Sequence, residues 1–128
     1  MLRAEQNGEV LPTTRAMRSW IWELSTIRPL GESCAGIMVA LEGQLPTLYP
    51  KYVAAMQKMG FSDDDLEFFI VHIEGDTEHA HVGLELTDRY ATSPALQERA
   101  IAAVRASAEM RFSMLDGIHA QLVTRKAA

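Results

Sequence analysis

The sequence has little of what marks a secreted, membrane-spanning or nucleic-acid-binding protein. Its single cysteine, Cys34, excludes an internal disulfide and is typical of a reducing cytoplasm. No apolar run approaches the roughly 18 residues that a transmembrane helix needs, and the N-terminus lacks the apolar stretch of a signal peptide. The net charge of −5, with no cluster of lysine or arginine, argues against nucleic acid as a partner. Composition therefore predicts a cytoplasmic globular protein that binds neither membranes nor nucleic acid.

The alternation of apolar and polar residues that marks β-strands is also missing, and local signals favour an all-α bundle of about four helices. Ser62 and Ser93 are good N-caps, and Pro94 suits the first position of a helix. The sequence predicts a short arm over residues 1–11 and a single helical domain over residues 12–125. The helices are expected at about residues 13–27, 33–59, 62–90 and 93–125.

The helix expected over residues 62–90 has polar residues where a core-facing stripe should be apolar. The stripe reads Phe69, His72, Asp76, His79, Gly83, Leu86 and Tyr90. Offsets of four and three residues place His72, Asp76 and His79 on one helix face. A buried carboxylate without a partner costs several kcal/mol (about 3–5 when an ion pair is broken), and a divalent cation supplies that partner. A mixture of histidine and carboxylate ligands favours iron or manganese.

The helix expected over residues 33–59 has a similar anomaly, because Glu42 is the single carboxylate in an otherwise apolar stripe. Pro46 cannot donate a hydrogen bond to the carbonyl of Glu42, so the helix should kink or break there. Glu42, His72, Asp76 and His79 would then form a metal site across two packed helices, the usual arrangement in helical bundles. The alternative is an ordinary polar network, in which Asp76 pairs with Arg111 or Lys58.

Other candidate groups have weaker support. Glu78 with His81, and Asp116 with His119, have ligand-like spacing but fall off the apolar face, so we expect them to be exposed, or to contact the ligands without binding the metal. Cys34 has no neighbouring histidine or lysine to lower its pKa, which argues against a nucleophilic role. Arg111 is the nearest candidate for clamping a carboxylate substrate.

Three segments resemble the haem-oxygenase-like iron-containing redox enzymes, relatives by fold of the TenA and PqqC proteins. They read ALEGQLP over residues 40–46, FFIVHIEGDTEHA over residues 68–80 and RFSMLDGI over residues 111–118. The most specific part is His-x-x-x-Asp-x-x-His with a glutamate about thirty residues upstream. In that family this pattern binds iron, which the resemblance carries to Glu42, His72, Asp76 and His79. Members use iron and dioxygen to oxidise small organic substrates.

The sequence departs from the family in its length. Members are normally much longer, and an upstream half supplies another glutamate and histidine to complete a site for two iron ions. Residues 1–41 contain no histidine. The resemblance therefore implies a half-length haem-oxygenase-like bundle with one or two iron ions. A homodimer, or a partner chain that supplies the missing half, is expected.

Two functions follow from this comparison. The first is a non-haem iron-dependent oxidoreductase, or half of one, that uses dioxygen on a small organic substrate. The alternative is a non-catalytic, half-length module of the same fold that binds metal or dimerises.

Overall fold

The protein is all-α throughout residues 10–127, the part that the computed structural model describes, and this confirms the predicted fold class. Most of the expected arm over residues 1–11 lies outside the described residues. The π-helical segment η1 and the 3₁₀ turn η2 join α3 to α4 without a loop. The elements are α2 (Pro12–Thr26), α3 (Leu30–Cys34), η1 (Ala35–Leu41), η2 (Glu42–Gln44), α4 (Leu45–Lys58), α5 (Glu67–Tyr90) and α6 (Pro94–Ala127).

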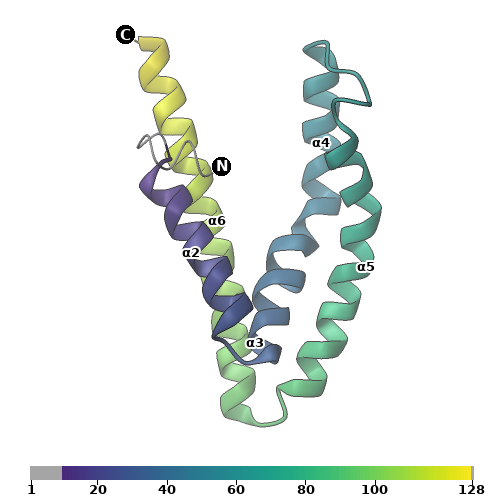
Figure 1. Ribbon diagram of the computed structural model, residues 1–128, viewed down its shortest axis with the longest axis vertical. Coiled ribbons are helices and arrows are strands. Elements are labelled where there is room, and N and C mark those ends of the chain that lie inside the picture. The colour runs from purple at the N-terminus through teal and green to yellow at the C-terminus, as the bar shows by residue number, and fades with distance from the viewer. Residues whose placement is uncertain (1–9, 128) are drawn as a thin grey trace.

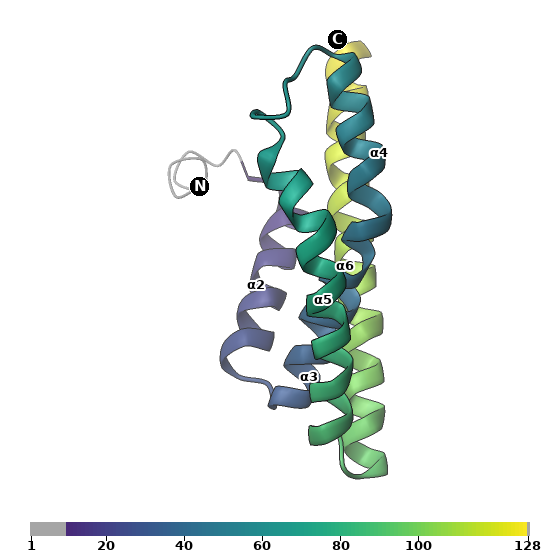
Figure 2. The same cartoon turned by 90° about the vertical axis from the view of Figure 1, so that its right-hand side faces the viewer.

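The helices form a V with two arms (Figure 1). One arm contains α2 beside α6, and the other contains α4 beside α5. The short α3 packs on both α5 and α6 near the closed end of the V, and η1 contacts the same two helices. Figure 2 shows α6 running along the full length of the molecule. Among the described helices, none combines the length and the apolar character needed to cross a membrane.

Small residues form much of the buried core between the helices. Leu24 of α2 is fully buried, and a Cβ atom added to Gly36 of η1 would lie 2.7 Å from its Cδ1 atom. Ser107 of α6 is also fully buried and accepts a hydrogen bond of 2.8 Å from the indole N–H of Trp20. These contacts show that α2, η1 and α6 approach closely because the side chains between them are small.

Of the two serines predicted to cap helices, Ser93 does so and Ser62 does not. Ser93 caps α6 as predicted, because its Oγ accepts the N–H of Leu96 at 3.3 Å. The predicted start of α5 at Ser62 is wrong, since α5 begins at Glu67. The Asp65 carboxylate instead accepts hydrogen bonds from the N–H and O–H of Ser62, at 2.9 and 2.7 Å, and so stabilises a turn. These hydrogen bonds hold the pKa of Asp65 below its ordinary value.

A buried carboxylate, that of Glu32 on α3, links the two parts of the α2–α6 arm. Its side chain is 3% exposed and lies 2.6 Å from Arg99 of α6 and 3.2 Å from Arg28, which follows α2. Arg28 also lies 2.6 Å from Glu23, so each carboxylate has a cationic partner. This ion-pair network offsets the cost of burying Glu32.

Pro46 changes the helix type rather than ending the helix. The N–H of Leu45 donates to the carbonyl of Glu42 in a 3₁₀ turn, while Pro46, in the first turn of α4, has no N–H to donate. The Leu41 carbonyl, whose α-helical donor would have been Leu45, instead accepts a hydrogen bond of 2.7 Å from Arg111 of α6. The helix does not break at Pro46, and the irregularity that the sequence predicted near Glu42 takes the form of the 3₁₀ turn η2.

Candidate metal centre

Three of the four predicted ligands lie together where η2 meets α5. The Nδ1 atom of His79 is 3.2 Å from Oε2 of Glu42 and 3.4 Å from Oδ1 of Asp76. Each residue offers a ligand atom within 4.8 Å of the other two. Nitrogen and oxygen donors bind small divalent ions at about 2.1 Å, so two ligands of one ion lie up to about 4.2 Å apart. Small side-chain movements would therefore bring all three onto one ion.

The Asp76 carboxylate shows a specific need for a cation. Its side chain is fully buried, and its Oδ2 atom has no hydrogen-bond partner. A buried oxygen of this kind costs roughly 1–3 kcal/mol when it stays unpaired, and more when it is charged. A metal ion bound between Asp76, Glu42 and His79 would balance the charge of this buried carboxylate, so the residues present fit a divalent metal.

Close packing of the helix backbones brings Glu42 to the two ligands on α5. Gly83 of α5 faces η1, and a Cβ atom added there would lie 2.6 Å from the Cβ atom of Met38. Gly43 faces Ala80, whose Cβ atom would lie at an ordinary contact distance of 3.4 Å from an added Cβ. Gly83 is thus the glycine that permits the short separation across which Glu42 reaches Asp76 and His79.

The fourth predicted ligand, His72, lies outside this cluster in the structure. It occupies α5 one turn before Asp76, where its Nδ1 atom is 2.6 Å from the carbonyl oxygen of Phe68. Its ring is 4.3 Å from the ring of Phe68 and 6.4 Å from that of Tyr49, measured between centroids. Histidines that bind metals usually donate their other ring N–H to a carbonyl or carboxylate. The contact with Phe68 thus leaves Nε2 of His72 as the nitrogen available to a metal.

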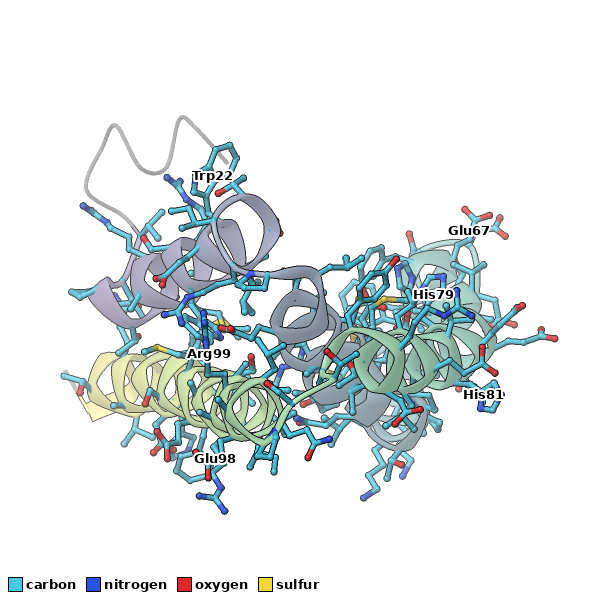
Figure 3. The ribbon with its side chains drawn as sticks, turned by 90° about the horizontal axis from the view of Figure 1, so that it is seen from below. Trp22, Glu67, His79, His81, Glu98 and Arg99 are labelled. Carbon is cyan, nitrogen blue, oxygen red and sulfur yellow. The ribbon has the colours of Figure 1, made fainter. Side chains whose placement is uncertain are left out.

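The close pairing of Asp76 with Arg111 that the alternative predicted does not form in the described residues, although the two charges interact at longer range. In the described part of the chain, Arg111 donates to the Leu41 carbonyl and makes no ion pair with Asp76. His81 lies on a different side of α5 from His79 (Figure 3), exposed, with Nε2 3.4 Å from Glu85. Glu78, Asp116 and His119 are exposed too, as predicted. These observations leave His79, Asp76 and Glu42 as the grouped candidates.

Cys34 supports no thiol chemistry at this site. It is buried at the end of α3, and burial raises the pKa of its thiol. A raised pKa disfavours the reactive thiolate at neutral pH.

Aromatic residues of α4 and α5 pack together beside His72, one of the predicted ligands. Tyr49 of α4 packs edge-on against Phe69, with ring centroids 5.1 Å apart, and Phe69 packs edge-on against Phe68 at 5.4 Å. Burial raises the pKa of the Tyr49 hydroxyl. The feature of the sequence that could have placed Tyr49 near the metal ligands is its position in the same helical stripe as Glu42. The contact between Arg111 and Leu41 joins residues 70 positions apart and had no local signal.

Comparison with known proteins places this geometry in context. The sequence pattern of a family described as iron-containing redox enzyme matches residues 2–112. A 4-aminobenzoate synthase from Nitrosomonas europaea is 27% identical over 114 residues, which cover 88% of this chain and 46% of the relative. The chain therefore spans less than half the length of that relative. No solved structure matches the chain significantly. Because the family pattern covers most of its length, the chain belongs to the family of iron-containing redox enzymes.

Proposed function

We propose that Glu42, Asp76 and His79 bind an iron ion, and that the chain is a non-haem iron-dependent oxidoreductase, or half of one. The observation that carries the proposal is the buried, unpaired Oδ2 atom of Asp76 beside Glu42 and His79. A helix retains such a carboxylate at a cost in stability, so it needs a compensating cation. Membership of the iron-containing redox enzymes supports iron as that cation, and manganese suits the same donors.

When bound, the iron would supply the one-electron chemistry that allows dioxygen to oxidise an organic molecule. The protein's own side chains set the surroundings of that chemistry. Asp76 provides an anchor held in place by burial, whereas the His79 side chain is 57% exposed and is the most accessible of the three ligands. We propose His72, which lies one turn before Asp76 on α5, as a further ligand once its ring turns from the Phe68 carbonyl towards Asp76.

The substrate class is proposed from the same comparison. The relative from Nitrosomonas europaea is named for making a small aromatic amine, and we propose a small organic substrate for this chain. The chain matches less than half of that relative, so the identity of the substrate and the use of dioxygen remain proposals.

The proposal is tested by loading the metal-free protein anaerobically with ferrous iron and measuring iron per chain after removal of the excess. About one iron per chain is expected for the wild type. His79→Ala should reduce the iron content strongly with little loss of helicity. His81→Ala is the matched control, because His81 lies two residues away on an outer side of the same helix and pairs with Glu85. Equal iron in both variants would reject the site.

A second variant separates metal binding from folding. Asp76→Leu removes the buried unpaired oxygen, so the metal-free variant should be at least as stable as the metal-free wild type. Iron stabilises only proteins that bind it in the folded state. Iron should therefore raise the melting temperature of the wild type but not that of Asp76→Leu. A comparable rise in both proteins contradicts the assignment of Asp76.

The second candidate function is a non-catalytic metal-binding or dimerisation module. It is favoured by the position of His72, which leaves a cluster of only three ligands in the described residues. Dioxygen consumption separates the two candidates. Iron-dependent consumption supports the oxidoreductase, whereas bound iron without consumption supports the module.

Association with a second copy or with a partner chain also stays a proposal. The chain exposes 8866 Å², against roughly 6,800 Å² for a compact monomer of this mass by the usual scaling of area with size. Exposed large apolar side chains along α6 include Ile101 and Phe112. Sedimentation equilibrium of the purified chain measures whether it self-associates, and a monomer at all concentrations would leave only the partner chain.

A further inference from the structure

The pocket between α4 and α6 is lined by an arginine that forms no close ion pair in the described residues, although the buried Asp76 carboxylate acts on it at longer range. The pocket has a volume of about 140 Å³ and is lined by Tyr49 and Tyr52 from α4 and by Arg111 from α6, with leucine and methionine side chains completing the wall. Arg111 is half-buried, and the Leu41 carbonyl is its hydrogen-bond acceptor. In the described part of the chain no carboxylate forms an ion pair with it. A guanidinium has five N–H donors, so most of its capacity is available to a ligand.

The position of Arg111 connects this pocket with the metal centre. The carbonyl that holds its Nη1 atom belongs to Leu41, the residue before the ligand Glu42. Tyr49 lines the pocket and also packs against Phe69 and near His72. Burial lowers the pKa of Arg111, but an arginine remains protonated in proteins. The guanidinium is therefore a fixed positive charge between the pocket and the metal ligands.

We infer that this pocket binds a small carboxylate of about one-ring size, with the Arg111 guanidinium as its counter-ion. Guanidinium and carboxylate groups form paired hydrogen bonds in one plane, and these bonds are stronger when partly buried. The size follows from the volume, because an engineered apolar cavity of about 150 Å³ in another protein holds one benzene molecule. The apolar wall would contact the ring or a short aliphatic chain. Binding of the carboxylate does not depend on the proposed function. Only the statement that this carboxylate is the substrate of the iron centre rests on it.

The test uses benzoate as the probe and the metal-free full-length chain, with binding measured by isothermal titration calorimetry. Benzamide has the same shape without the charge, so wild-type protein should bind it at least about tenfold more weakly than benzoate. Arg111→Gln should weaken benzoate binding about ten- to hundredfold, while Arg111→Lys should retain part of the affinity. Arg105→Gln is the matched control, because Arg105 is an exposed arginine on the same helix. It should bind benzoate like the wild type.

Equal binding of benzoate and benzamide by the wild type would overturn the inference, and this comparison needs no variant to fold. Unchanged benzoate affinity in a folded Arg111→Gln protein, or no benzoate binding by the wild type, would also overturn it. Iron binding is measured separately on the same preparations. Benzoate binding that depends on Arg111 in a protein that binds no iron supports the pocket and rejects the proposed metal centre.

Discussion

Two glycines of α5 should respond in opposite ways to the same substitution. Alanine is favoured over glycine in a helix by about 1 kcal/mol, and this gain applies to both Gly75 and Gly83. At Gly75 the added Cβ atom meets nothing within 4 Å. At Gly83 it would lie 2.6 Å from the Cβ atom of Met38 and 3.4 Å from the backbone nitrogen of Val39. These atoms are fixed to the η1 backbone, so the helices must move apart.

The magnitudes follow from these contacts. Overpacking a close contact costs typically about 1–3 kcal/mol, and we take the upper part of that range for Gly83 because Met38 Cβ cannot rotate away. After the gain in helix propensity, Gly83→Ala should lower the free energy of unfolding by about 1–2 kcal/mol. Gly75→Ala should raise it by about 0.5–1 kcal/mol.

The assay is urea denaturation of the three metal-free proteins, followed by circular dichroism at 222 nm. Wild type should lie between the two variants in its denaturation midpoint. Gly83→Ala should also bind iron more weakly than Gly75→Ala, because moving α5 from η1 carries His79 away from Glu42. A Gly83→Ala protein as stable as the wild type would refute the argument that this glycine sets the helix separation.

Two further predictions concern charged groups away from the metal centre. Hydrogen bonds from Ser62 hold the pKa of Asp65 below its ordinary value, so the carboxylate stabilises the fold above the unfolded pKa of about 4. The difference in free energy of unfolding between the wild type and Asp65→Asn should therefore shrink as the pH falls through the lowered pKa. Urea denaturation at several pH values measures this difference. A difference that does not change with pH contradicts the assignment. Glu32→Gln should lower the free energy of unfolding by about 2 kcal/mol. Breaking a fully buried ion pair costs roughly 3–5 kcal/mol, and the loss is smaller here because the two arginine partners of Glu32 are partly exposed. Thermal unfolding checks this loss, and an unchanged melting temperature contradicts it.

The sequence predicted the helical class and several boundaries because these depend on local chemistry. Ser93 and Pro94 together specify the start of α6. The face that α6 buries was predicted wrongly. Ile101 and Phe112 belong to a row of apolar residues at helical spacing, which predicts that they are buried, but both are exposed, whereas Ala103 and Ser107 are buried. Closely packed helices select for small side chains, so the size of an apolar residue was a misleading guide to its burial.

The candidate site was predictable to the extent that it follows helical spacing. Asp76 and His79 lie three residues apart on one helix, so their proximity is a local property. The approach of Glu42 was inferred from its isolated position in an apolar stripe, and the structure brings it within 3.2 Å of His79. The orientation of His72 could not be predicted, because it depends on whether its ring bonds to the Phe68 carbonyl or turns towards Asp76.

The π-helical segment before Glu42 has a consequence for how related sequences are aligned. A π-helix bonds each N–H to the carbonyl five residues earlier rather than four, so η1 accommodates about one residue more than an α-helix of the same length. Each residue of an α-helix advances the side-chain direction by about 100°. A relative that lacks one residue between positions 35 and 41 and is α-helical there would therefore keep its equivalent of Glu42 on the same side of the helix, whereas all seven residues in an α-helix would turn it to a different side. An alignment across this segment has to allow a one-residue gap before the metal-binding carboxylate is compared.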